Sequence, residues 1–80
     1  MQMVYPNPSK RVINIKMDQF KEVRIYNLSG QILINSTIKQ IDLSALSGGV
    51  YLIKLENNKG QSYSLRFIKQ WVDWSDLLLG

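Results

Sequence analysis

Four carboxylates in the first 70 residues are the side chains that could serve in acid–base chemistry: Asp18, Glu22, Asp42 and Glu56. The sequence contains neither histidine nor cysteine. It therefore lacks the usual general base near neutral pH, the commonest metal ligand, any thiol nucleophile and any disulfide. None of the four acids lies beside a second acid in a clear site. We expect no enzymatic activity, no metal and no cofactor.

Structural roles suffice for these acids. Asp18 and Glu22 flank a basic loop that contains Lys16 and Lys21, which predicts exposed ion pairs of little energetic value. Asp42 stands at the start of a turn, where a carboxylate typically accepts a backbone hydrogen bond.

The positive charges suggest a second kind of chemistry. The formal net charge is +4, and a basic surface with interleaved aromatic side chains can bind single-stranded nucleic acid. The residues concerned are Lys10, Arg11, Lys16, Lys21 and Arg24, with Tyr5, Phe20 and Tyr26. These charges alternate as exposed strand faces do, and the aromatic motif of an RNA-recognition domain is missing. We expect no nucleic acid partner.

The elements that must position these residues are strands. Apolar and polar residues alternate with a period of two, in stretches rich in β-branched and aromatic residues. The predicted strands cover residues 12–16, 22–26, 31–36, 41–43, 50–57 and 61–68. The sequence predicts an all-β, immunoglobulin-like antiparallel β-sandwich of about seven short strands with Greek-key connections.

One face of each strand is predicted to form the core. The predicted core residues are Ile13, Ile15, Val23, Ile25, Ile32, Ile34, Leu43, Leu46, Tyr51, Ile53, Leu55, Tyr63, Leu65 and Phe67.

Turn-forming residues separate the strands. Residues 27–30 and 57–60 each end in glycine, which adopts positive φ without strain. The Pro6–Ser9 segment is predicted to be a rigid edge or loop, because proline cannot donate to a strand ladder. The spacing Leu46-x-x-Gly49-x-Tyr51 is typical of a tyrosine corner, in which the hydroxyl binds upstream backbone.

Residues 71–80 depart from this pattern. Trp71, Trp74, Leu77 and Leu78 recur at helical spacing, which predicts one or two amphipathic turns. We divide the chain into a domain of residues 1–70 and an atypical Trp/Leu-rich tail of residues 71–80. The interpretations left open for the tail are an expression remnant or fused segment, an extension that packs on the sandwich, or a peptide that docks in a partner groove. Self-association through the four apolar residues is one hypothesis.

Several motifs are similar to those of a known family. The first is Tyr5-Pro6-Asn7-Pro8 before a short strand, and the last is Phe67-Ile68-Lys69, an apolar pair followed by a base. The second motif comprises Val23, Ile25, Tyr26, Asn27 and Gly30. The third comprises Ile41, Asp42, Leu43, Ser44, Leu46, Gly49 and Tyr51. In this order, from about Val4 to Gln70, the chain resembles the type IX secretion system C-terminal sorting domain in its type A form, the Por secretion tail family.

The resemblance implies a non-catalytic secretion signal at the C-terminus of a cargo protein. The implied route leads through the periplasm, where an outer-membrane translocon recognises the domain, to the cell surface or the medium. A surface sortase then removes the domain and attaches the cargo to a surface anchor or releases it. The implied recognition residues are Tyr5, Pro6, Asn7, Pro8, Gly30, Asp42, Leu46, Gly48, Gly49, Tyr51 and Lys69.

A binding or adhesion module is the alternative hypothesis, with a carbohydrate or a protein as ligand. Small β-sandwiches serve both purposes, and fold alone does not distinguish them. Sugar sites usually expose aromatic side chains, whereas Tyr51, Tyr63 and Phe67 are predicted to face the core. Tyr5, Phe20 and Tyr26 remain as candidates.

Overall fold

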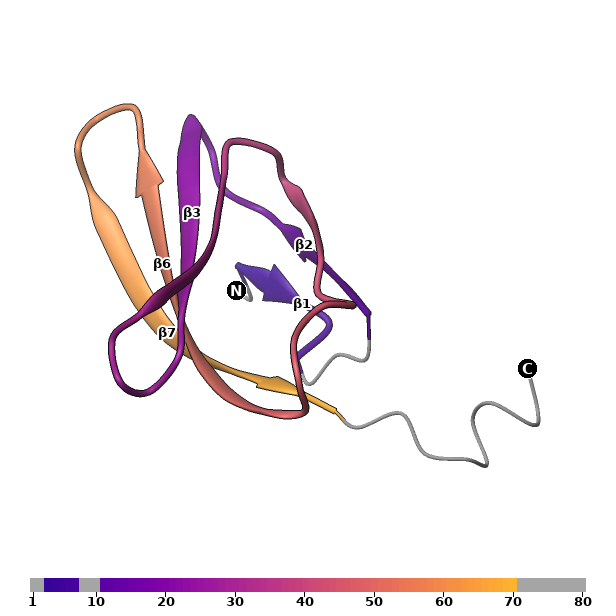
Figure 1. The fold of residues 1–80 in the computed structure, drawn as a ribbon. Coiled ribbons are helices and arrows are strands. Elements are labelled where there is room, and N and C mark those ends of the chain that lie inside the picture. Colours follow the sequence, from indigo (N-terminus) through magenta and orange to yellow (C-terminus); the bar gives the residue numbers. More distant parts are fainter. Residues whose placement is uncertain (1–2, 8–10, 71–80) are drawn as a thin grey trace.

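Seven strands form two antiparallel sheets in the computed structural model, which describes residues 3–7 and 11–70 (Figure 1). The strands are β1 (Val4–Tyr5), β2 (Val12–Ile15), β3 (Phe20–Tyr26), β4 (Ile32–Ser36), β5 (Gln40–Asp42), β6 (Gly49–Asn57) and β7 (Ser62–Lys69). The expected all-β, immunoglobulin-like sandwich is confirmed. The helical turns predicted within residues 71–80 lie outside the described residues. No helix that could cross a membrane occurs in the described part of the chain.

The larger sheet has the order β4-β3-β6-β7, and the smaller has the order β1-β2-β5. Two tight hairpins, β3–β4 and β6–β7, build the larger sheet around β6, the longest strand. The chain crosses between the sheets after β2, β4 and β5. These crossings bring segments that are distant in sequence to the same ends of the sandwich (Figure 1).

The core lies between the two sheets and follows the predicted alternation. In β6, for example, Tyr51, Ile53 and Leu55 are buried while Lys54 is exposed. The buried apolar residues are Val4, Ile13, Ile15, Met17, Val23, Ile25, Ile41, Leu43, Tyr51, Ile53, Leu55 and Phe67. Val4, Met17 and Ile41 join the core although the predicted set omits them. Ile34, Leu46 and Leu65 pack against the core while remaining partly exposed.

Two predicted core residues are exposed, and the fold shows why. The register between β3 and β4 shifts between Ile25 and Tyr26, so Ile32 lies opposite Tyr26 instead of continuing the inward alternation. Ile32 is 51% exposed as a result. Tyr63 lies opposite buried Leu55, but it lines an open pocket at one end of the sandwich and is 39% exposed.

Candidate functional site

Most of the predicted recognition residues lie at one end of the sandwich, which we call the motif end. It comprises the turn of residues 27–31, the corner of residues 43–49 and the last residues of β7 (lower part of Figure 1), together with Asn7, which is hydrogen-bonded to the end of β7. The strand registers explain this convergence. Tyr26 at the end of β3 pairs with Leu52 near the start of β6, and Gly49 at that start pairs with Lys69 at the end of β7.

Tyr51 forms the predicted tyrosine corner. Its hydroxyl donates a hydrogen bond to the carbonyl oxygen of Ser47, and its side chain is 8% exposed. Gly49, between these two residues, has a φ of 154°, a conformation that residues with a side chain rarely adopt. The backbone of the corner therefore favours glycine at position 49, and its hydrogen bond depends on the hydroxyl of Tyr51.

Lys69 is buried at the other side of the corner. Its side chain is 6% exposed, and its Nζ donates a 2.9 Å hydrogen bond to the carbonyl oxygen of Leu46. A charged lysine is rarely buried without a partner, and here the corner supplies a backbone acceptor. Lys69 therefore ties the end of β7 to the corner.

Asn7 binds the outer edge of β7 with both atoms of its amide. Nδ2 donates to the carbonyl oxygen of Arg66 at 3.2 Å, and Oδ1 accepts from the backbone N–H of Ile68 at 3.1 Å. The side chain thus occupies hydrogen-bonding positions that a neighbouring strand would use. Asn7 follows a cis Tyr5–Pro6 peptide bond. Pro8 lies outside the described residues.

Asp42 stabilises the turn that opens the corner. Its Oδ1 accepts hydrogen bonds from the Ser44 hydroxyl and from the Ser44 backbone N–H, the latter at 2.8 Å. These two bonds, together with the nearby charges of Arg11 and Lys69, lower the pKa of Asp42 below its ordinary value. The carboxylate is therefore ionised at neutral pH and holds the turn, as its position in the sequence predicts.

Two asparagines, whose side-chain roles were not predicted from the sequence, organise the hairpin turns: Asn27, a member of the second motif, and Asn57. Asn27 Oδ1 accepts from the backbone N–H groups of Ser29 and Gln31, both at 3.0 Å, while its Nδ2 donates to Gln31 Oε1 at 3.1 Å. Gly30 in this turn has a φ of 89°. The turn is therefore an Asx-type turn closed by a glutamine side chain.

The second turn repeats this arrangement. Asn57 Oδ1 accepts from Lys59 at 2.9 Å and from Gln61 at 3.0 Å, and its Nδ2 donates to Gln61 Oε1 at 2.9 Å. Gly60 has a φ of 80°. The signal that could have revealed both turns is the repeated Asn-x-x-Gly-Gln pattern.

The described recognition residues fall into three groups by their exposure to solvent. Tyr5, Pro6, Gly30 and Asp42 are exposed, whereas Asn7, Leu46, Gly48 and Gly49 are half-buried, and Tyr51 and Lys69 are buried. A partner that meets the folded domain can contact the first two groups. Tyr51 and Lys69 act on such a partner only through the shape that they impose.

The carboxylates do not converge on a catalytic site. Glu22 pairs with Arg24 at 2.8 Å, and Lys21 pairs with Glu56 at 3.3 Å. These partners differ from the expected pairing of the loop acids with Lys16 and Lys21. A side-chain hydrogen bond with Tyr26, and next the negative charge of Glu22, raise the pKa of Arg24 above its ordinary value. Within the described residues, no group of three potential metal ligands occurs.

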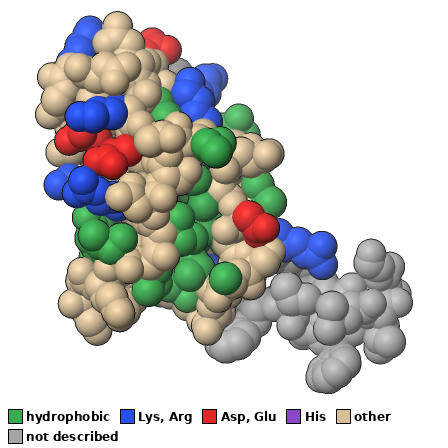
Figure 2. Space-filling view, turned by 45° about the horizontal axis from the view of Figure 1, so that its top comes forward, with side chains coloured by type: hydrophobic (Ala, Val, Ile, Leu, Met, Phe, Trp, Pro, Cys, Tyr) green, Lys and Arg blue, Asp and Glu red, His purple; other side chains and the backbone are tan. Residues whose placement is uncertain are grey.

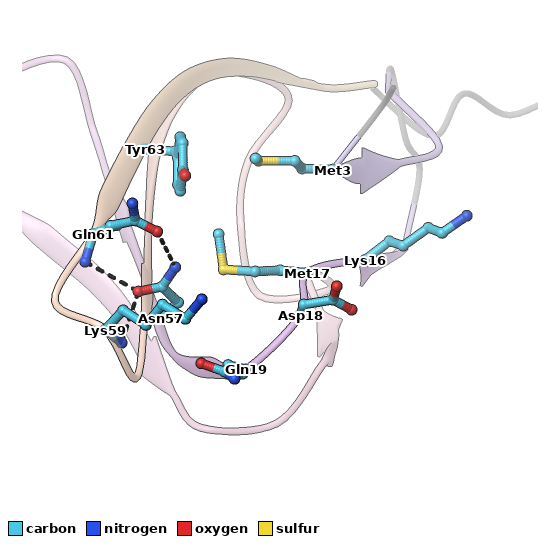
Figure 3. A pocket seen from close by; sticks show the side chains of 9 residues that line it. All are labelled: Met3, Lys16, Met17, Asp18, Gln19, Asn57, Lys59, Gln61 and Tyr63. Atoms are coloured by element: carbon cyan, nitrogen blue, oxygen red, sulfur yellow. Dashed lines mark hydrogen bonds between the residues drawn. The ribbon is translucent and has the colours of Figure 1, made fainter.

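The opposite end of the sandwich contains a pocket of about 440 Å³ (Figure 3). Met3, Met17 and Tyr63 provide apolar surface, and polar side chains surround them, with Asn57 and Gln61 hydrogen-bonded to each other. The remaining lining residues are Lys16, Asp18, Gln19 and Lys59. None of the predicted recognition residues lines this pocket.

Comparison with known proteins gives two findings. Residues 3–70 match the family model described as the secretion system C-terminal sorting domain. Beta-agarase D of Zobellia galactanivorans is 30% identical over 67 residues, which cover 81% of this chain and 14% of the agarase. The chain thus spans a small fraction of the length of this relative. No solved structure matches the chain significantly.

Proposed function

The chain belongs to the family of secretion system C-terminal sorting domains, and from that premise we propose that its motif end is the surface that an outer-membrane translocon recognises. Members of this family are signals for type IX secretion. Such a signal directs the protein that carries it across the outer membrane, to the cell surface or the medium. The domain itself acts as a signal and has no catalytic role of its own.

The observation that carries the proposal is the convergence of separate sequence motifs at one end of the sandwich. Asn7, Gly30 and Gly48 come from three different segments and are at least partly exposed there. Tyr51 and Lys69 are buried beneath and fix the shape. A translocon that recognises this end meets a preformed surface, so little conformational entropy is lost on binding.

The proposed route has three steps. The cargo and its domain pass through the periplasm, the translocon binds the motif end, and a surface sortase removes the domain. The cargo is then anchored to the surface or released. Pro8 and the tail residues Trp71, Trp74, Leu77 and Leu78 lie outside the described residues, and a role for them in recognition or self-association belongs to this proposal.

An export assay tests the proposal. Residues 1–70 and 1–80 are fused separately behind a periplasm-targeted fluorescent reporter in a host with the type IX apparatus, and medium, surface and periplasm are fractionated. We expect the reporter outside the cell, and the longer fusion shows whether residues 71–80 are tolerated. Retention of both folded fusions in the periplasm, in a host that exports a sorting domain of its own, would refute the proposal.

A carbohydrate-binding module is the second candidate. It is favoured by Tyr63, which is 39% exposed and lines the pocket beside the amides of Gln19 and Gln61. Concave sites that combine an aromatic ring with a few polar groups are suited to small ligands. Titration with agarose oligosaccharides tests this candidate, because the relative is an agarase. Tyr63→Ala should abolish any binding that is seen, while leaving export unchanged.

A further inference from the structure

Strand β4 is an outer strand of the larger sheet and, among the described residues, pairs with β3 alone. Asn27, directly after β3, donates its backbone N–H to the Gln31 carbonyl oxygen. Backbone groups alternate in direction along a strand, so Ile25 also directs its backbone groups toward β4, whereas Arg24 directs them toward β6. Asn35 lies opposite Arg24. The backbone N–H and C=O of Asn35 therefore point away from β3, where another strand could pair with them.

Strand β4 lacks the charged residues and the proline that commonly prevent strand addition, and its one irregularity is the register shift near Ile32. Ile32–Ser36 contains no charged residue and no proline, although natural edge strands commonly carry lysine or proline. Half of the eight large apolar side chains that are exposed among the described residues lie on or beside β4: Leu28, Ile32, Leu33 and Ile38. Figure 2 shows hydrophobic side chains at the surface along the middle of one face, with the charges gathered mainly at its upper left.

The other three outer strands are shorter or partly covered. Strand β7 has Asn7 hydrogen-bonded to its edge at Arg66 and Ile68, and Arg66 is an exposed charge on that strand. Strand β1 has two residues and is followed by Pro6, and β5 has three residues. Within the described part of the chain, β4 is thus the edge best suited to accept another strand.

We propose that β4 accepts an extended polypeptide strand of the secretion machinery, which adds to the larger sheet beside β4. This inference rests on the proposed function. Strand addition uses backbone hydrogen bonds and therefore tolerates changes of side chain. Such tolerance suits a signal whose relative retains 30% identity over the matched residues. Strand β4 also begins directly after the Gly30 turn, so one partner can contact the motif end and β4 together.

Asn35→Pro tests the proposal in the full chain of 80 residues, fused behind the reporter. Proline removes an outward N–H without removing a bond to β3, and it is tolerated at sheet edges. We expect export to fall by about tenfold or more, the effect of losing roughly one hydrogen bond and the strand geometry. Ser64→Pro is the matched control, because Ser64 is an exposed residue of the opposite outer strand and should leave export unchanged.

Leu33→Lys provides a second test that keeps every backbone N–H. A lysine on an edge strand opposes strand addition, and Leu33 is 37% exposed, so the fold should tolerate it. Ser64→Lys, at an exposed residue of β7 outside the motif end, is the control. Circular dichroism and cooperative thermal unfolding establish which variants fold.

The outcomes separate this inference from the proposed function. Loss of export in the folded β4 variants, with normal export of the β7 controls, supports the inference. Normal export of the β4 variants beside an exported parent overturns the inference alone. An exported parent that is a dimer in sedimentation, with β4 variants that are monomeric yet exported, also overturns it, because the occupant is then a second copy. A parent that stays inside the cell refutes both proposals.

Discussion

The Nζ of Lys69 lies 2.9 Å from the carbonyl oxygen of Leu46, a residue 23 positions earlier in the chain. The bond joins the last strand to the corner that precedes β6. Gly49 and Lys69 are also paired in the ladder between β6 and β7. The base at the end of β7 thus has a structural role, which follows from its burial at 6% exposure.

Two substitutions of Lys69 separate the role of its ammonium group from that of its aliphatic stem, the four methylene groups of the side chain. Lys69→Met keeps most of the stem and should cost about 1 kcal/mol of unfolding free energy, the value of the lost hydrogen bond. Lys69→Ala also removes buried methylene groups, each worth about 0.8 kcal/mol, and should cost about 2–4 kcal/mol. Urea unfolding measures both. Equal losses in the two variants would show that packing of the stem does not contribute.

The tyrosine corner predicts a small and specific loss of stability. Tyr51→Phe removes the hydroxyl that donates to the Ser47 carbonyl and should lower the free energy of unfolding by about 0.5–1.5 kcal/mol. Tyr63→Phe is the control, because Tyr63 is 39% exposed in the pocket, and it should change stability by less than about 0.5 kcal/mol. Thermal unfolding of the two variants compares them. A Tyr51→Phe variant as stable as the parent would contradict the corner bond.

The two turns differ in burial while sharing their hydrogen bonds. Asn57 is 7% exposed, whereas Asn27 is half-buried. Asn57→Ala should therefore cost about 1–3 kcal/mol, because the backbone N–H groups of Lys59 and Gln61 lose a shielded acceptor. Asn27→Ala should cost less, since water can replace its side chain. Urea unfolding of the pair checks the order, and a larger loss for Asn27→Ala would contradict the role of burial.

The fold was predictable because alternation is a local property of each strand. Tyr51, Ile53 and Leu55 follow it without exception, and the tyrosine corner is encoded within six consecutive residues. The prediction that Ile32 is buried was wrong because the register shift between β3 and β4 depends on how two strands pair. The prediction that Tyr63 is buried was wrong because its exposure depends on where the smaller sheet ends. Neither feature can be inferred from the alternation within a single strand.

The site was predictable as a set of residues, while its geometry was not. The bond from Lys69 to Leu46 and the two bonds from Asn7 to β7 connect segments 23 to 61 residues apart. No short spacing encodes such contacts. The turn asparagines are different, because Asn27 and Asn57 each bind within four residues. Their repeated pattern was available in the sequence.

Asn7 predicts a local change in hydrogen exchange that global stability would not reveal. Its Oδ1 accepts from the Ile68 N–H at an exposed edge, so Asn7→Ala should speed exchange of the Ile68 amide by about tenfold. The Phe67 amide belongs to the other alternating set, which faces β6, and should keep its protection. Asn7→Asp is the matched variant, because it keeps the acceptor for Ile68 and loses the donor to Arg66. We expect the Ile68 amide to stay protected in Asn7→Asp. Equal loss of protection in the two variants would show that the Arg66 bond, and not the Ile68 bond, holds Asn7 against β7.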